Sequence, residues 1–174
     1  MKRTILTLFF VLVFSAVCET AYSQGFPYHL YAPRTLSELN DLNTKVMKES
    51  EVEGSKNLAI SAKPFYSAIR LQYAGKSRSL SKEKAGLFKI WAESLNVQST
   101  NTKSGVLDII KKEYLFRECE KEYWLTVQTP AANDFPKDMA DGDLITLYLM
   151  VVGGIETKGK WESIYLTNSF KIYQ

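Results

Sequence analysis

Hydrophobic residues recur along the chain with two different spacings, which predict where helices and strands alternate. In the first segment, apolar side chains return every three or four positions. These positions are Leu36, Leu39, Val46 and Met47. Thr35 and Glu38 at the start of this segment have the spacing of a capping box, in which each side chain bonds the backbone amide of the other residue. The pattern predicts an amphipathic helix over residues 36–49.

The spacing of apolar residues then changes to every second position, as in a strand, and afterwards returns to that of a helix. Residues 65–73 alternate between a mostly apolar and a mixed face, as a strand does, and Gly75 to Ser79 are expected to end it. Ser81 can cap a second helix that extends to Asn96. Its expected buried stripe comprises Leu87, Ile90, Trp91 and Leu95.

The second half of the chain is predicted to be rich in strands. Two strands, 113–118 and 122–128, flank a tight polar turn, and Thr129-Pro130 permits a short helix after them. After a turn at Asp141–Asp143, residues 144–152 are apolar on both faces, as in a central strand. A last strand begins at Trp161, after a longer hairpin loop expected between Gly153-Gly154 and Lys158-Gly159.

This order predicts an α+β fold of about five mostly antiparallel strands in a curved sheet or small open barrel, packed with two to three helices. In outline it resembles the oligonucleotide/oligosaccharide-binding barrel, which has five strands. The helix expected at 81–96 departs from that outline. An open sheet covered by helices is the alternative.

The N-terminus has the layout of a secretory signal peptide over residues 1–23. Lys2 and Arg3 precede an apolar stretch, and Ala21 and Ser23 are small residues at the positions that a signal peptidase requires. Cleavage near Ser23-Gln24 predicts a secreted or periplasmic bacterial protein with no stable membrane span. Residues 24–174 are expected to form a single domain, in which residues 24–34 are an extended lead-in.

Cys18 offers a different form of export. A cysteine at the end of an apolar stretch can receive a lipid, but the branched Val17 before it makes this the less favoured interpretation. After cleavage, Cys119 is the one remaining cysteine, and it is expected to be buried or to form an intermolecular bridge.

Charge and residue counts exclude several function classes. The net charge is +3, and it falls to +2 when Lys2, Arg3 and Glu19 leave with the signal peptide, so no basic patch indicates nucleic acid. His29 is the single histidine, and with Cys119 it cannot make a standard zinc site or a plausible catalytic triad. We therefore predict no metal, no cofactor and no catalytic residues.

Aromatic and polar side chains alternate on three predicted strands, which favours binding. Trp and Tyr offer large rigid surfaces with one polar atom, suited to glycans and to protein interfaces. The predicted ligand-binding residues are Arg70, Gln72, Trp124, Gln128, Trp161 and Tyr165. The expected partner is an envelope protein or a glycan. The competing interpretation is that a helix covers these aromatic side chains.

Two other functions remain open from the sequence. A cell-envelope polysaccharide hydrolase needs two suitably spaced carboxylates, which Glu118 and Glu122 or a neighbouring pair could supply. Glu118 and Glu122 are expected on one face if their turn is tight. A structural envelope component could assemble through Cys119 or an exposed strand edge.

Overall fold

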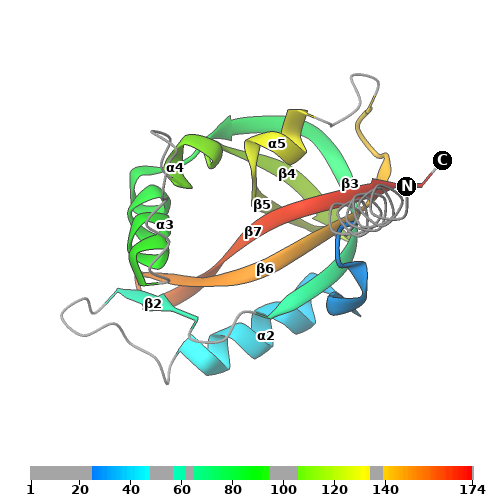
Figure 1. The fold of residues 1–174 in the computed structure, drawn as a ribbon. Helices are drawn as coiled ribbons and strands as arrows, with labels where there is room; N and C mark the ends of the chain where they lie inside the picture. The colour runs from blue at the N-terminus through cyan, green and yellow to red at the C-terminus, as the bar shows by residue number, and fades with distance from the viewer. Residues whose placement is uncertain (1–24, 48–56, 62–64, 95–105, 134–138, 174) are drawn as a thin grey trace, which may run out of the picture.

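A computed structural model describes residues 25–47, 57–61, 65–94, 106–133 and 139–173 (Figure 1). The predicted signal peptide, and with it Cys18, lies outside these ranges. The elements in chain order are a 3-10 turn Tyr28–Leu30, β1 Ala32–Arg34, α2 Leu36–Met47, β2 Leu58–Ile60, β3 Tyr66–Ser79, α3 Lys82–Ser94, α4 Val106–Ile109, β4 Lys112–Glu118, β5 Lys121–Val127, α5 Thr129–Asn133, β6 Leu144–Thr157 and β7 Lys160–Ile172.

The five longer strands pair in a closed ring. β3 pairs with β4, β4 with β5, β5 with β7, β7 with β6, and β6 again with β3. All these pairs are antiparallel except β5–β7, which is parallel. The three-residue strands β1 and β2 extend the sheet beside β3 and β6, to seven strands in all. The α+β class is confirmed, and the predicted five strands omit these two short ones.

One face of every ring strand contributes to a single core cluster, which therefore fills the inside of the ring. Its buried members are Leu36, Leu39, Ile69, Leu71, Phe116, Leu125, Val127, Ile145, Leu147, Leu149, Val151 and Tyr165. A second cluster joins the opposite face of β6 and β7 to Leu87 and Phe88 of α3. In Figure 1, α3 accordingly lies at one end of β6 and β7, and α2 lies along another side of the sheet.

Local capping signals place the two longer helices as predicted. At α2, the Glu38 amide donates to Thr35 Oγ1 at 3.1 Å and the Thr35 amide donates to Glu38 Oε2 at 2.8 Å, so the capping box is confirmed. At α3, the Lys84 amide donates to Ser81 Oγ. Of the described segments, no helix is long and apolar enough to cross a membrane.

Two segments that contain glycine were expected to mark the ends of strands, but each lies within a continuous strand. β3 runs past Gly75, where a positive φ of 64° accompanies a register shift between Tyr73 and Ser77. β6 runs through Gly153-Gly154, so the predicted longer hairpin loop is wrong. These two glycines allow close approach, because added Cβ atoms would collide with the Ala59 carbonyl and the Met47 sulfur, respectively.

The hairpin turns fall between these continuous strands. Lys158 and Gly159, both at positive φ, make the tight turn from β6 to β7. Cys119 lies in the turn between β4 and β5 with φ of 53°, and its side chain is exposed. Of the two alternatives expected for Cys119, burial is therefore wrong, and an intermolecular bridge stays a prediction.

Candidate functional site

The ring is incompletely paired between β5 and β7. Among the described residues, the pairing of these strands comprises Thr126–Leu166 and Val127–Thr167. By contrast, β5 pairs along its whole length with β4, and β7 pairs with β6 from end to end. The N-terminal parts of β5 and β7 therefore border an opening in the wall of the ring, which we call the seam.

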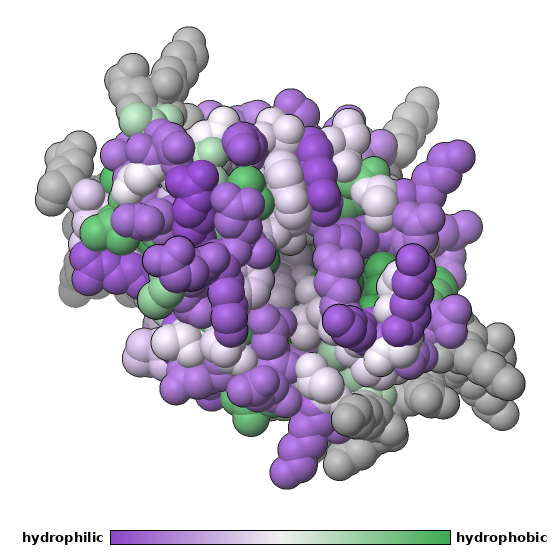
Figure 2. Space-filling model, turned by 180° about the vertical axis from the view of Figure 1, so that it is seen from behind, coloured by the Kyte–Doolittle hydropathy of each residue, from purple (hydrophilic) through white to green (hydrophobic). Residues whose placement is uncertain are grey.

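The seam holds a groove of about 350 Å³. Its lining residues come from α2, β5 and β7: Asn40, Thr44, Glu122, Tyr123, Trp124, Leu125, Trp161, Glu162, Ser163 and Tyr165. This volume is within the range of small-ligand sites, which combine aromatic surface with a few placed polar groups. The face of the molecule in Figure 2 is mostly hydrophilic, with a hollow near its centre lined by residues of intermediate hydropathy.

Three of the six predicted binding residues, Trp124, Trp161 and Tyr165, meet in this groove. They do so from different faces of the sheet. Because Thr126 pairs with Leu166, alternation places Trp124 on the face that carries Leu166, and Trp161 and Tyr165 on the opposite face. These residues therefore do not share one face of the sheet, and they converge because the strands separate.

The other three predicted residues lie away from the groove. Arg70 on β3 stacks over the ring of Tyr173, 4.8 Å from its centroid. Gln72 pairs in register with Leu144 of β6. Gln128 donates from Nε2 to Asn168 Oδ1 at 2.7 Å. The six predicted binding residues therefore lie on separate surfaces of the protein and not at one site.

Tyr165 forms a wall of the groove from within the core. It is 4% exposed, and its hydroxyl donates to Asn40 Oδ1 of α2 at 2.5 Å. Burial raises the pKa of this phenol well above its ordinary value, while a hydrogen bond with Ser163 opposes the shift. Tyr165 therefore ties α2 to β7 as a neutral hydrogen-bond donor.

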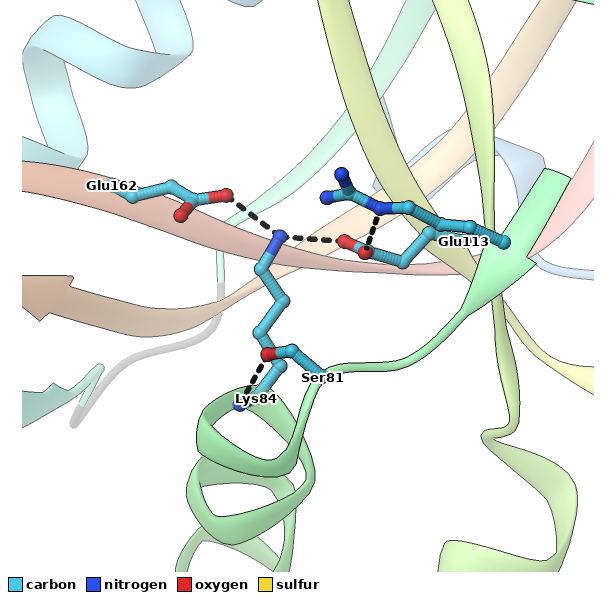
Figure 3. A network of polar contacts seen from close by, with 5 residues as sticks. Ser81, Lys84, Glu113 and Glu162 are labelled. Carbon is cyan, nitrogen blue, oxygen red and sulfur yellow. Dashed lines mark hydrogen bonds and ion pairs between the residues drawn. The ribbon is translucent and has the colours of Figure 1, made fainter. Parts of the chain in front are cut away.

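A network of charged side chains connects the two sides of the seam (Figure 3). Lys84 Nζ lies 2.5 Å from Glu113 of β4 and 2.6 Å from Glu162 of β7. Glu113 also accepts from Arg78 Nε at 2.8 Å, and the Arg78 guanidinium lies over the Trp124 ring, 4.1 Å from its centroid. The network therefore links Trp124 on one wall with Glu162 on the other.

Sequence reasoning missed the centre of this network, although a signal was present. Lys84 stands three and four positions before Leu87 and Phe88, so it belongs to the stripe that α3 buries. We assigned that stripe from apolar residues alone. A lysine at such a position buries its stem and needs a carboxylate near its ammonium, which Glu113 supplies.

Glu118 and Glu122 do not lie on one face of the hairpin as predicted. Glu118 pairs in register with Lys121, and Glu122 with Arg117, so the two glutamates lie on opposite faces and the same-face expectation is wrong. Glu118 accepts from the Leu36 amide at 2.6 Å and thus caps α2. Within the described ranges, no group of three potential metal ligands occurs.

Two larger hollows, of about 570 and 560 Å³, lie beside α2 and beside α3. Neither is lined by an aromatic side chain among the described residues, so the groove at the seam remains the candidate site. Comparison of the chain with protein-family models, curated proteins and solved structures finds no match.

Proposed function

We propose that this chain is an exported, non-catalytic binding protein whose ligand, an envelope protein or a glycan, occupies the groove at the seam. The observation that carries the proposal is that Trp124 and Trp161 line one groove from two separated strands. Half-buried tryptophans around an open groove are the side chains that contribute most to binding energy in recognition sites. The signal-peptide layout of residues 1–23 supports export of the protein.

The charges of the groove favour binding over catalysis. Its two carboxylates are each already engaged, Glu122 with Arg117 and Glu162 with Lys84. General acid–base chemistry needs one group that gives a proton and another that accepts it, whereas each of these two carboxylates forms an ion pair with a cation. The single histidine, His29, lies in the exposed 3-10 turn.

The proposal is tested by capture of ligands from the cell envelope. The exported protein, its start at Gln24 checked by N-terminal sequencing, is immobilised and exposed to envelope proteins and solubilised glycans. We expect Trp124→Ala and Trp161→Ala each to reduce capture about tenfold or more. Arg70→Ala is the matched control, because Arg70 lies outside the groove on β3.

The opposite pattern of capture among these variants would refute the assignment of the ligand to the groove. Capture that survives both tryptophan substitutions but is lost in Arg70→Ala would move the site to the β3–β6 surface. A mature chain that retains residues 1–23 would contradict export by signal cleavage.

A further inference from the structure

We propose that the ligand of the groove is a short, uncharged oligosaccharide. This inference rests on the proposed function and narrows it to one chemical class. It is carried by three features of the groove: ion-paired carboxylates, unused hydrogen-bonding atoms, and an indole held in place by a neighbouring cation.

The groove contains charged atoms but little net charge. Glu122 Oε1 lies 3.1 Å from Arg117 Nε, and Glu162 Oε1 lies 2.6 Å from Lys84 Nζ. Each lining carboxylate has a cation beside it, and each of these cations also contacts a second carboxylate: Arg117 contacts Asp141, and Lys84 contacts Glu113, which is paired with Arg78 as well. A charged ligand would therefore meet charges of both signs and gain little net Coulombic attraction. The second oxygen of each carboxylate has no partner among the described residues and can accept a hydrogen bond from a neutral hydroxyl.

The α2 wall supplies the complementary donors. Asn40 uses its carbonyl oxygen for the Tyr165 hydroxyl, which leaves its two amide hydrogens without a partner in the described part of the chain. Thr44, one helical turn further on, lines the same groove and carries a hydroxyl. Sugar hydroxyls both donate and accept, so they match a groove that presents carboxylate acceptors and amide donors together.

Trp124 presents an ordered aromatic surface. Arg78 lies over one face of the indole and is itself held by Glu113, which is 1% exposed. This arrangement limits the motion of the indole before any ligand arrives, which lowers the entropy cost of binding. The other face or the edge of the ring remains for the apolar C–H side of a sugar.

A peptide strand is the main competing occupant, since β5 and β7 diverge at the seam. The structure favours it less, because the stretch of β5 beyond the two pairs with β7 is short, Lys121 to Leu125. In addition, Lys84 ties β4 to β7 across the same opening. Strand addition needs an accessible edge for its backbone hydrogen bonds, and this contact crosses the edge that a peptide would use.

The test uses the three tryptophans of the chain as separate reporters. Indole N–H signals of the exported protein are followed by NMR during titration with neutral oligomers of glucose and of N-acetylglucosamine, with an oligogalacturonate as an anionic control, and with strand-forming hexapeptides. We expect a neutral oligosaccharide to shift the signals of Trp124 and Trp161. The signal of Trp91, which belongs to α3 and packs against the second core cluster, should not shift.

The outcomes distinguish a failure of the saccharide assignment from a failure of the proposed binding function. Shifts of both groove indoles by a neutral oligosaccharide, with affinity about tenfold lower in Trp161→Ala, support the inference. Shifts caused by the hexapeptides or by the anionic sugar alone overturn the saccharide assignment and leave the groove as the site. If no titrant shifts these indoles, the saccharide assignment falls; if envelope capture also ignores both tryptophan substitutions, the proposed function falls with it.

Discussion

Replacing Lys84 with methionine tests whether the charged network at the seam stabilises the fold. The substitution keeps most of the length of the side chain and removes its charge. The Lys84 side chain is 6% exposed, so it does not exchange its partners freely for water. After the substitution Glu113, which is 1% exposed, keeps Arg78 as its charged partner, and Arg78 is 46% exposed.

The expected loss of stability follows from these exposures. Removing one partner of a buried ion pair costs about 3–5 kcal/mol, because the remaining charge stays buried. Arg78 still compensates part of the Glu113 charge, which places the loss near the lower limit. The contact with Glu162, whose side chain is 56% exposed, contributes about 0–1 kcal/mol. We therefore expect Lys84→Met to lower the free energy of unfolding by about 3 kcal/mol.

Urea denaturation measures this loss, provided that the dependence of the free energy on urea concentration is unchanged. Glu162→Gln is the matched control and should lower the free energy by less than about 1 kcal/mol. The double variant Lys84→Met/Glu113→Gln should be more stable than Lys84→Met, because it removes a buried carboxylate whose charge Arg78 compensates only in part. A loss below about 1 kcal/mol in Lys84→Met would refute the reasoning.

Two further predictions concern glycine and tyrosine residues. Gly153→Ala should lower the free energy of unfolding by about 1–3 kcal/mol, because the added Cβ meets the Ala59 backbone. Gly86→Ala should raise it by about 0.5–1 kcal/mol, because Gly86 lies on α3 with open space around it. Equal effects of the two substitutions in urea denaturation would contradict both predictions. Because the folded state raises the pKa of Tyr165, it keeps a proton that the unfolded chain releases near pH 10, so the free energy of unfolding should decline as pH rises from about 9 to 11. Tyr165→Phe should decline less steeply over this range, and an identical slope would assign the effect to other groups.

The helices were predictable because their signals are local. The capping residues Thr35 and Ser81 lie within one turn of the amides that they bond, so no distant contact is needed to recognise them. The strand ends were not predictable at the glycines. Gly153 signals a turn in isolation, but it is retained inside β6 because β2 packs against it, and that contact depends on a segment more than ninety positions earlier in the chain.

The candidate site shows the same division between local and distant information. Alternation indicated Trp124 and Trp161 as candidate binding residues, since both carry an aromatic side chain beside polar neighbours on a strand. It could not tell that the two strands separate, because alternation describes one strand and not the register between two. Arg70 was grouped with them for this reason, although β6 keeps it on another surface.

Side chains, in place of a backbone ladder, connect the elements around the seam. Tyr165 connects β7 to α2 through Asn40, and Lys84 of α3 connects β7 to Glu113 of β4. A continuous β5–β7 ladder would give up backbone hydrogen bonds if a ligand entered, and each buried group left without a partner would cost about 1–3 kcal/mol. Side-chain contacts can adjust their rotamers and admit a ligand without that loss. The incomplete pairing of β5 and β7 therefore leaves room for the proposed ligand without the loss of backbone hydrogen bonds.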